Sequence, residues 1–105
     1  MSSKVICSAL RARNYVRFFY KDNVTPTVVE PYTYGTNKSG HRVLSAWLVS
    51  GETHDPKPPL WRLYLEDEMR RVETLPETFA RNRPDYNPND SRFQHIECRL
   101  APPGA

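Results

Sequence analysis

HRVLSAWLVSG, residues 41–51, is the stretch of sequence that most constrains the fold. Its alternate residues fall into two sets, and both are largely apolar: Val43, Ser45, Trp47 and Val49 in one, and Leu44, Ala46, Leu48 and Ser50 in the other. Successive side chains of a strand point to opposite faces, so both faces of this segment need cover. The segment therefore predicts a strand in the middle of a barrel or beneath a helix.

Four more strands are predicted around this segment. Residues 15–20 and 27–34 are aromatic and β-branched, and Pro31 indicates a bulge or an edge position because proline lacks an N–H donor. Residues 35–40 have the composition of a hairpin loop. Residues 60–65 alternate apolar and polar side chains, and residues 69–75 follow the acidic residues 66–68. Five short strands in so small and aromatic a chain predict an antiparallel barrel.

A helix is predicted before the strands. Residues 3–13 place Val5, Ile6, Ala9 and Leu10 on one stripe, which is the pattern of a short amphipathic helix. So short a helix does not persist alone in water, so it should cover an opening of the barrel. The expected fold class is thus mainly β with an N-terminal helix, in one domain of residues 1–76.

Residues 77–105 are expected to form a C-terminal extension packed on the barrel, with the last few residues frayed. Phe79, Tyr86 and Phe93 are large apolar groups that an idle tail would not need, so they should dock on the sheet face that the helix leaves open. Residues 93–100 are also compatible with one more edge strand. The alternative is that this extension becomes ordered only on a partner.

Charge and cysteine content bound the function. The 105 residues include 15 basic and 12 acidic side chains, a net charge of +3. Eleven of the basic residues are arginine, whose planar fork binds phosphate or carboxylate. The chain shows neither a secretory signal nor an apolar stretch of membrane-spanning length, so we expect a cytoplasmic protein. Cys7 and Cys98 are expected to be two reduced thiols, which would pair only if the tail folded back on the first helix.

Catalysis is not expected. His41, His54 and His95 lie in no nucleophile motif, and the adjacent Asp67 and Glu68 would point to opposite faces of a strand. The sequence also has no phosphate-binding glycine loop and no metal-ligand spacing. We therefore predict a chain that is not an enzyme and holds neither metal nor cofactor.

Arginines alternate with aromatic residues along the predicted strands, as they do in proteins that stack bases and hold phosphates. The candidate ligand-binding residues are Arg17, Tyr20, Trp47, Arg62 and Tyr64. The expected ligand is a nucleic acid or a nucleotide-like anion. The residue pattern also allows a blander interpretation, in which the aromatics are core and the arginines are surface charges.

The chain contains, in order, a predicted leading helix, RNYVRFFYKD (13–22), VVEPYTYG (28–35), RVLSAWLVSG (42–51) and WRLYLEDEMRRVE (61–73). In the order of these segments the chain resembles the WYL domain of bacterial and phage regulators. The resemblance implies an Sm-like, SH3-like barrel whose pocket binds nucleic acid or a small effector. Arg62 takes the place of the leading arginine of the family's RxFRLDRI motif, whereas Glu68 stands at its second arginine and Arg42-Val43-Leu44 at the name-giving tripeptide.

The continuation into ETF (77–79) and RPDYNPND (83–90) resembles a short stand-alone group of WYL-like proteins. The function expected from this is a non-enzymatic binding or sensing module in a bacterial or phage regulatory or defence system. The alternative is a structural subunit that contacts a protein partner through the loop with Pro56, Pro58 and Pro59 and through the tail.

Overall fold

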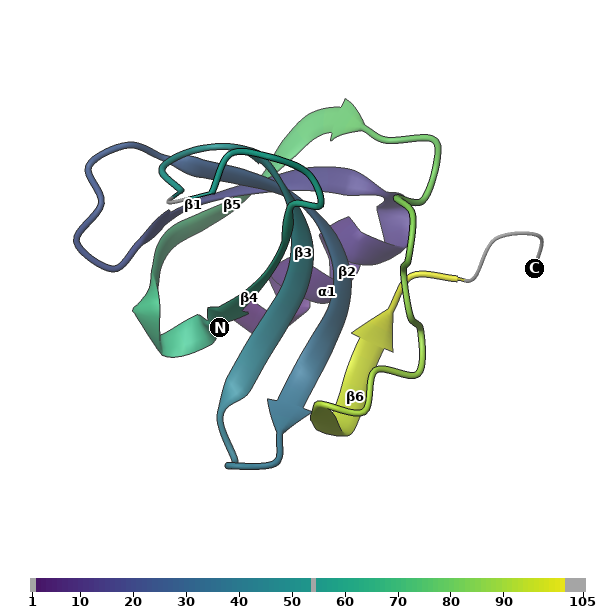
Figure 1. The fold of residues 1–105 in the computed structure, drawn as a ribbon. Helices are drawn as coiled ribbons and strands as arrows, with labels where there is room; N and C mark the ends of the chain where they lie inside the picture. Colours follow the sequence, from purple (N-terminus) through teal and green to yellow (C-terminus); the bar gives the residue numbers. More distant parts are fainter. Residues whose placement is uncertain (1, 54, 102–105) are drawn as a thin grey trace.

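The chain folds as one helix and a six-stranded antiparallel sheet (Figure 1). The computed structural model describes residues 2–53 and 55–101. In chain order the elements are α1 (Ser2–Ala12), β1 (Asn14–Tyr20), β2 (Thr27–Asn37), β3 (Arg42–Ser50), β4 (Trp61–Leu65), the 3-10 helix η1 (Glu66–Glu68), β5 (Met69–Thr78) and β6 (Phe93–Arg99). The mainly β class with an N-terminal helix is confirmed, and the edge strand considered at residues 93–100 is present as β6.

The sheet is bent around β2, which has three neighbours. The strand order is β4-β3-β2-β1-β5, and β6 pairs with the second half of β2 after β1 has left it. The register of β2 against β3 shifts between Pro31 and Thr33, so of the two alternatives predicted for the proline, a bulge or an edge position, the structure shows a register irregularity within a strand paired on both sides. Gly35 permits the pairing with β6, because a Cβ at this position would overlap the carbonyl oxygen of His95.

The sheet has six strands rather than the five predicted, and it is not closed. Over residues 2–53 and 55–101, no ladder joins β4 to β5. The 3-10 helix η1 links these two edge strands. Instead of a ladder bond, the backbone N–H of Leu65 donates to the hydroxyl oxygen of Tyr20 at 3.0 Å. The opening between the end of β1 and β4, here called the mouth, is therefore lined by side chains and has no backbone ladder across it.

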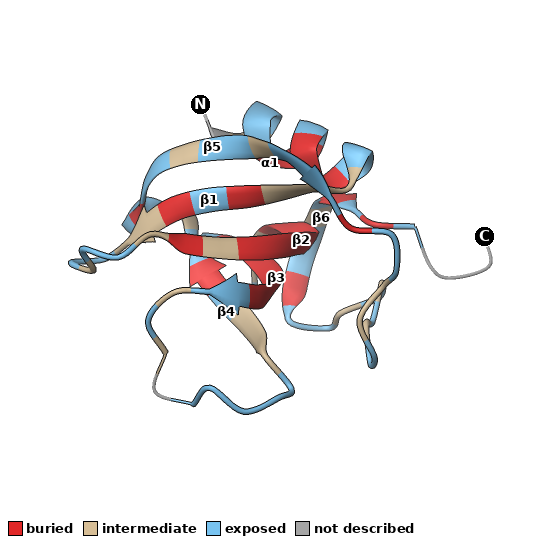
Figure 2. Cartoon of the chain, turned by 90° about the horizontal axis from the view of Figure 1, so that it is seen from above, coloured by how far each residue is buried: buried red, intermediate tan, exposed pale blue. Residues whose placement is uncertain are grey.

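Helix α1 packs on β1, β2, β5 and β6. Ile6, Ala9 and Leu10 are fully buried, as the stripe predicts, but Val5 is 37% exposed and Cys7 is buried instead. Buried and exposed stretches alternate along α1 in Figure 2. Strand β3 is buried from Val43 to Leu48, which agrees with its two apolar faces. Within the described residues, no helix has the length and apolarity needed to cross a membrane.

The prediction of two reduced thiols is wrong, because Cys7 and Cys98 form a disulfide. Pairing of β6 with β2 brings Cys98 beside α1, where the two Cα atoms lie 5.8 Å apart. The sequence pattern did not show this, because it depends on the path of the tail. The bond spans a sequence separation of 91 residues, for which the chain-entropy model gives a stabilisation of about 4–5 kcal/mol.

Residues 79–92, here called the docking segment, lie against the sheet between β5 and β6. Phe79 is 5% exposed and Phe93, the first residue of β6, is 8% exposed. Tyr86 is half-buried, its ring 4.9 Å from that of Tyr32, and its hydroxyl donates to the carbonyl oxygen of Leu100 at 2.6 Å. The segment is thus ordered within the chain. The fraying expected at the end of the tail falls on residues 102–105, outside the described residues.

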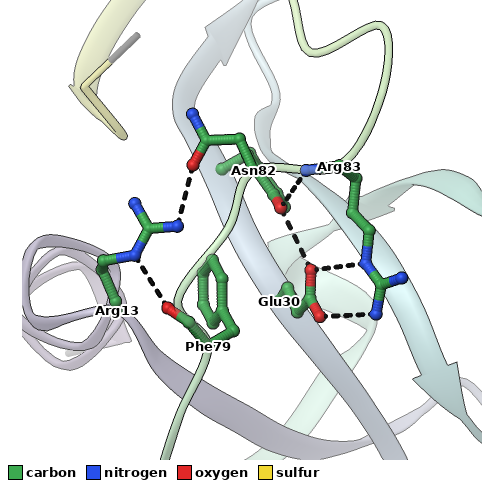
Figure 3. A network of polar contacts seen from close by, with 6 residues as sticks. Arg13, Glu30, Phe79, Asn82 and Arg83 are labelled. Atoms are coloured by element: carbon green, nitrogen blue, oxygen red, sulfur yellow. Dashed lines mark hydrogen bonds and ion pairs between the residues drawn. The ribbon is translucent and has the colours of Figure 1, made fainter. Parts of the chain in front are cut away.

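A polar network holds the docking segment in place (Figure 3). The buried carboxylate of Glu30 on β2 accepts from the guanidinium of Arg83 through Nε at 3.0 Å and through Nη2 at 2.9 Å. The hydroxyl of Tyr32 donates to the same carboxylate and accepts the backbone N–H of Arg83. Arg13 donates to the carbonyl oxygen of Phe79 and to the side chain of Asn82, each at 2.8 Å. These contacts join α1, β2 and the segment.

Candidate binding pocket

Three of the five predicted ligand-binding residues line one pocket. Tyr20, Arg62 and Tyr64 surround a hollow of about 520 Å³ at the mouth between β1 and β4. The rest of the lining comes from the β1–β2 turn, from β3 and β4, and from the loop after β3: Lys21, Asn23, Leu48, Glu52, Thr53 and Leu63. Arg17 and Trp47 do not line it.

Strand geometry explains this grouping. Arg62 and Tyr64 are two residues apart on β4 and so point to one face, and their partners across the ladder are Ala46 and Leu44. Tyr20 is the last residue of β1, where β1 and β4 meet without backbone pairing. The pocket therefore lies where the end of β1 approaches β4 without a backbone ladder.

The pocket has an aromatic floor. The ring of Tyr64, only 7% exposed, meets the ring of Tyr20 edge to face at 5.0 Å and that of Phe18 at 5.1 Å. Burial raises the pKa of Tyr64 from 10.0 to about 12, while the charge of Arg62 acts in the opposite direction. Tyr64 is thus a neutral phenol at pH 7, able to donate one hydrogen bond and to accept others.

Arg62 is the cation of the pocket wall. Its Nη1 donates to the carbonyl oxygen of Trp61 at 2.9 Å. Its Nη2 donates to the hydroxyl of Thr53 at 3.0 Å and to the carbonyl oxygen of Asp55 at 2.7 Å. A guanidinium has five N–H donors, so two remain. In the part of the chain that the structure describes, no carboxylate forms an ion pair with Arg62.

The pocket lining has two other charged residues. Lys21 is basic, and its Nζ lies 5.5 Å from the centre of the Tyr20 ring. Glu52 is acidic and exposed. Two cations against one anion, beside a floor of rings, suit an anionic ligand that carries a flat group.

The other two predicted residues have structural contacts elsewhere. Arg17 pairs with Glu73, which lies opposite it on β5. Trp47 lies under the guanidinium of Arg83, 4.9 Å from its ring centre, and its ring is 5.5 Å from that of Trp61. Trp47 precedes Leu48 on β3, so it points to the face opposite the pocket.

Sequence reasoning missed Lys21, Glu52 and Thr53 as lining residues. All three lie outside the regular strands. They come together only because the bent sheet places the end of β1 beside β3 and β4. The one available signal was the turn composition of residues 21–23 at the end of a predicted strand.

His41, His95 and the described part of the proline loop do not take part in a metal site formed by the described residues. In the described ranges, no three His, Cys, Asp or Glu side chains gather as a metal site would require. His54 lies outside those ranges. Pro56, Pro58 and Pro59 are exposed, in the loop that leads from Asp55 to β4.

The comparisons with known proteins add no relative to this description. No protein-family model, curated protein or solved structure matches the chain.

Proposed function

We propose that this chain is a non-enzymatic binding module whose pocket takes a nucleotide or the end of a nucleic-acid strand. The main support is Arg62, a cation without a carboxylate partner among the described residues, on the wall of a pocket floored by Tyr20 and Tyr64. Its two remaining N–H groups, one on Nε and one on Nη1, can each donate a hydrogen bond to an anionic oxygen. The phenols supply ring surface for a base and hydroxyl groups for its polar edge.

The size of the pocket agrees with a ligand of this class. About 520 Å³ lies within the range of small-molecule sites, and it is far smaller than the groove that a nucleic-acid duplex occupies. The partly buried setting of Tyr64 strengthens any bond that its hydroxyl makes, because water competes less there.

The proposal includes a relationship to the Sm-like barrel of the WYL domain and a sensing role in bacterial or phage regulation. A leading helix, the order of the strands and the position of Arg62 in a pocket support it. The proposed location is the cytoplasm, where the disulfide would meet reducing thiols.

A structural protein–protein subunit is the second candidate. Leu63 and Leu65 on edge strand β4 are each 37% exposed, and the loop with Pro56, Pro58 and Pro59 precedes this strand. The aromatic residues of the tail are engaged within the chain, so the loop and β4 would form the contact surface.

Fluorescence anisotropy tests the proposed function. Labelled mononucleotides and short DNA and RNA strands are titrated at about 50 mM and about 200 mM salt, because phosphate contacts weaken steeply over this range. Replacing Arg62 with Gln should weaken binding about 10- to 100-fold, the effect of losing a charge-assisted hydrogen bond. The exposed Arg71 is the matched control, and Arg71→Gln should bind like the parent.

Circular dichroism of each variant shows that it is folded, since Arg62 also holds the loop after β3. No binding of any of these ligands at the lower salt would overturn the proposed function. Salt-insensitive binding of a protein partner would favour the structural subunit instead.

A further inference from the structure

A groove beside the disulfide, away from the pocket just described, provides a second site. It measures about 530 Å³ and lies between α1 and β6. Six residues of the helix and one of β6 line it: Ser3, Lys4, Cys7, Ser8, Arg11, Ala12 and Glu97. Both cysteines are otherwise well covered, Cys7 being 6% and Cys98 5% exposed. Of the two, only Cys7 lines the groove.

We propose that this groove is a thiol-exchange site, where a small carboxylate-bearing thiol attacks Cys7 and reduces the bond to Cys98. Exchange requires a thiolate to reach one sulfur and expel the other. The groove offers that approach at Cys7. Because Cys98 does not line it, the two sulfurs should differ sharply in reactivity.

The chemistry is a two-step exchange. The incoming thiolate forms a bond to Sγ of Cys7 as the Cys7–Cys98 bond breaks, and the electron pair leaves on Sγ of Cys98, which then takes up a proton. A second thiolate attacks the sulfur of the bound small thiol and releases Cys7 as a thiolate. The protein gains two electrons and the proton on Cys98, and it gains a second proton when water protonates the Cys7 thiolate. The two small thiols leave as their disulfide.

The charges of the groove determine which thiols it attracts. Lys4 is three residues before Cys7 and Arg11 four residues after it, so both lie on the helix face of Cys7, and both are exposed. Glu97 is the one acidic residue of the lining, and its carboxylate is already paired with Arg42 at 3.0 Å. The field over Cys7 is therefore positive, which concentrates anionic thiols there and stabilises a thiolate.

Reduction should loosen the helix more than the strand. Strand β6 keeps its backbone pairing with β2 and its link to Tyr86 through Leu100. Helix α1 has only 11 residues and loses its cross-link to β6. Thiol exchange at Cys7 would thus act as a redox-dependent release of the N-terminal helix.

Mass spectrometry tests the site of attack in the oxidised full chain. The chain is treated briefly with limiting glutathione, quenched with an alkylating reagent and digested. We expect the glutathione adduct on Cys7 and the alkyl group on Cys98. An adduct mainly on Cys98, or an even distribution, would overturn the proposal. So would two free thiols in the chain after purification under oxidising conditions.

The rate of reduction tests the role of charge. The variant with Lys4→Gln and Arg11→Gln should be reduced by glutathione about 3- to 10-fold more slowly at low ionic strength, because anionic reactants are steered less. Its reduction by 2-mercaptoethanol, whose attacking thiolate carries a single negative charge and no carboxylate, should slow less than its reduction by glutathione. A variant with Lys38→Gln and Lys57→Gln, exposed lysines outside the groove, is the matched control. Equal rates with glutathione, or equal slowing with both thiols, would contradict the proposed steering.

Discussion

Replacing Arg83 with methionine should strongly destabilise the fold, because it leaves the carboxylate of Glu30 without its cation. The Glu30 side chain is 2% exposed and receives two hydrogen bonds from Arg83. Methionine keeps the apolar stem of the side chain but removes the charge and all its donors. The hydroxyl of Tyr32 would then be the one remaining side-chain donor to this carboxylate among the described residues.

The magnitude follows from how far the pair is buried. Breaking a fully buried ion pair by removing one partner costs about 3–5 kcal/mol. The Arg83 side chain is 41% exposed, so water screens the pair and the cost falls to about 2–3 kcal/mol. Loss of the contact between the guanidinium and the Trp47 ring adds about 0.5–1 kcal/mol. At about 4–8 °C per kcal/mol for a domain of this size, the melting temperature should fall by at least about 10 °C.

Urea unfolding followed by circular dichroism measures this cost in a double-mutant cycle of Arg83→Met and Glu30→Gln. The double variant should recover much of the loss, because it carries no unpaired charge, and the coupling energy should exceed about 1 kcal/mol. Arg81→Met, at an exposed position of the same segment, is the control and should stay within about 0.5 kcal/mol of the parent. If Arg83→Met is as stable as this control, or if the cycle shows no coupling, the network does not hold the segment.

Three further outcomes are expected. Gly35→Ala should cost about 1–3 kcal/mol by pushing β6 away from β2. In calorimetry, Gly40→Ala should show only the cost of its left-handed backbone, about 1 kcal/mol, because its φ is +86° while its Cβ would meet open space. Burial raises the pKa of Tyr34 and Tyr64 from 10.0 to about 12. The unfolded chain alone therefore loses these protons between pH 10 and 12, so urea midpoints should be steady at neutral and mildly alkaline pH and should fall over that range. A midpoint that stays constant between pH 10 and 12 would refute this. Leu10→Asp puts a charge in a fully buried position of α1, should cost several kcal/mol and should unfold the chain in circular dichroism; parent-like melting would show that α1 is not packed there.

The elements that the sequence predicted well are those determined by local pattern. The two apolar faces of β3, the buried stripe of α1 and the register irregularity at Pro31 each follow from side chains only a few residues apart. The open sheet and the disulfide depend instead on contacts between distant parts of the chain. Strand β6 brings Cys98 next to α1, and it can do so only because β1 pairs with β2 over just the first part of β2. Nothing in the periodicity of either segment indicates that exchange of neighbours.

The candidate site likewise contains residues that local spacing placed correctly and residues whose position depends on distant contacts. Arg62 and Tyr64 share a face by their spacing on one strand, so the sequence sufficed to place them together. Arg17 was grouped with them because its neighbours are aromatic, but its partner Glu73 is fixed by the register of β1 against β5. Trp47 was grouped with them because it is a large ring, although its place on β3 directs it to the other face.

The two faces of β3 separate the binding pocket from the docking segment, and the variants described above can test this separation. Leu48 lines the pocket, whereas Trp47 lies under Arg83 of the docking segment. A ligand can therefore occupy the pocket without displacing the segment. Arg62→Gln should lower affinity with a much smaller fall in melting temperature than Arg83→Met causes. Arg83→Met should lower the melting temperature while its folded fraction binds nucleotide as the parent does. Weaker binding by folded Arg83→Met would show that the two faces are coupled through β3.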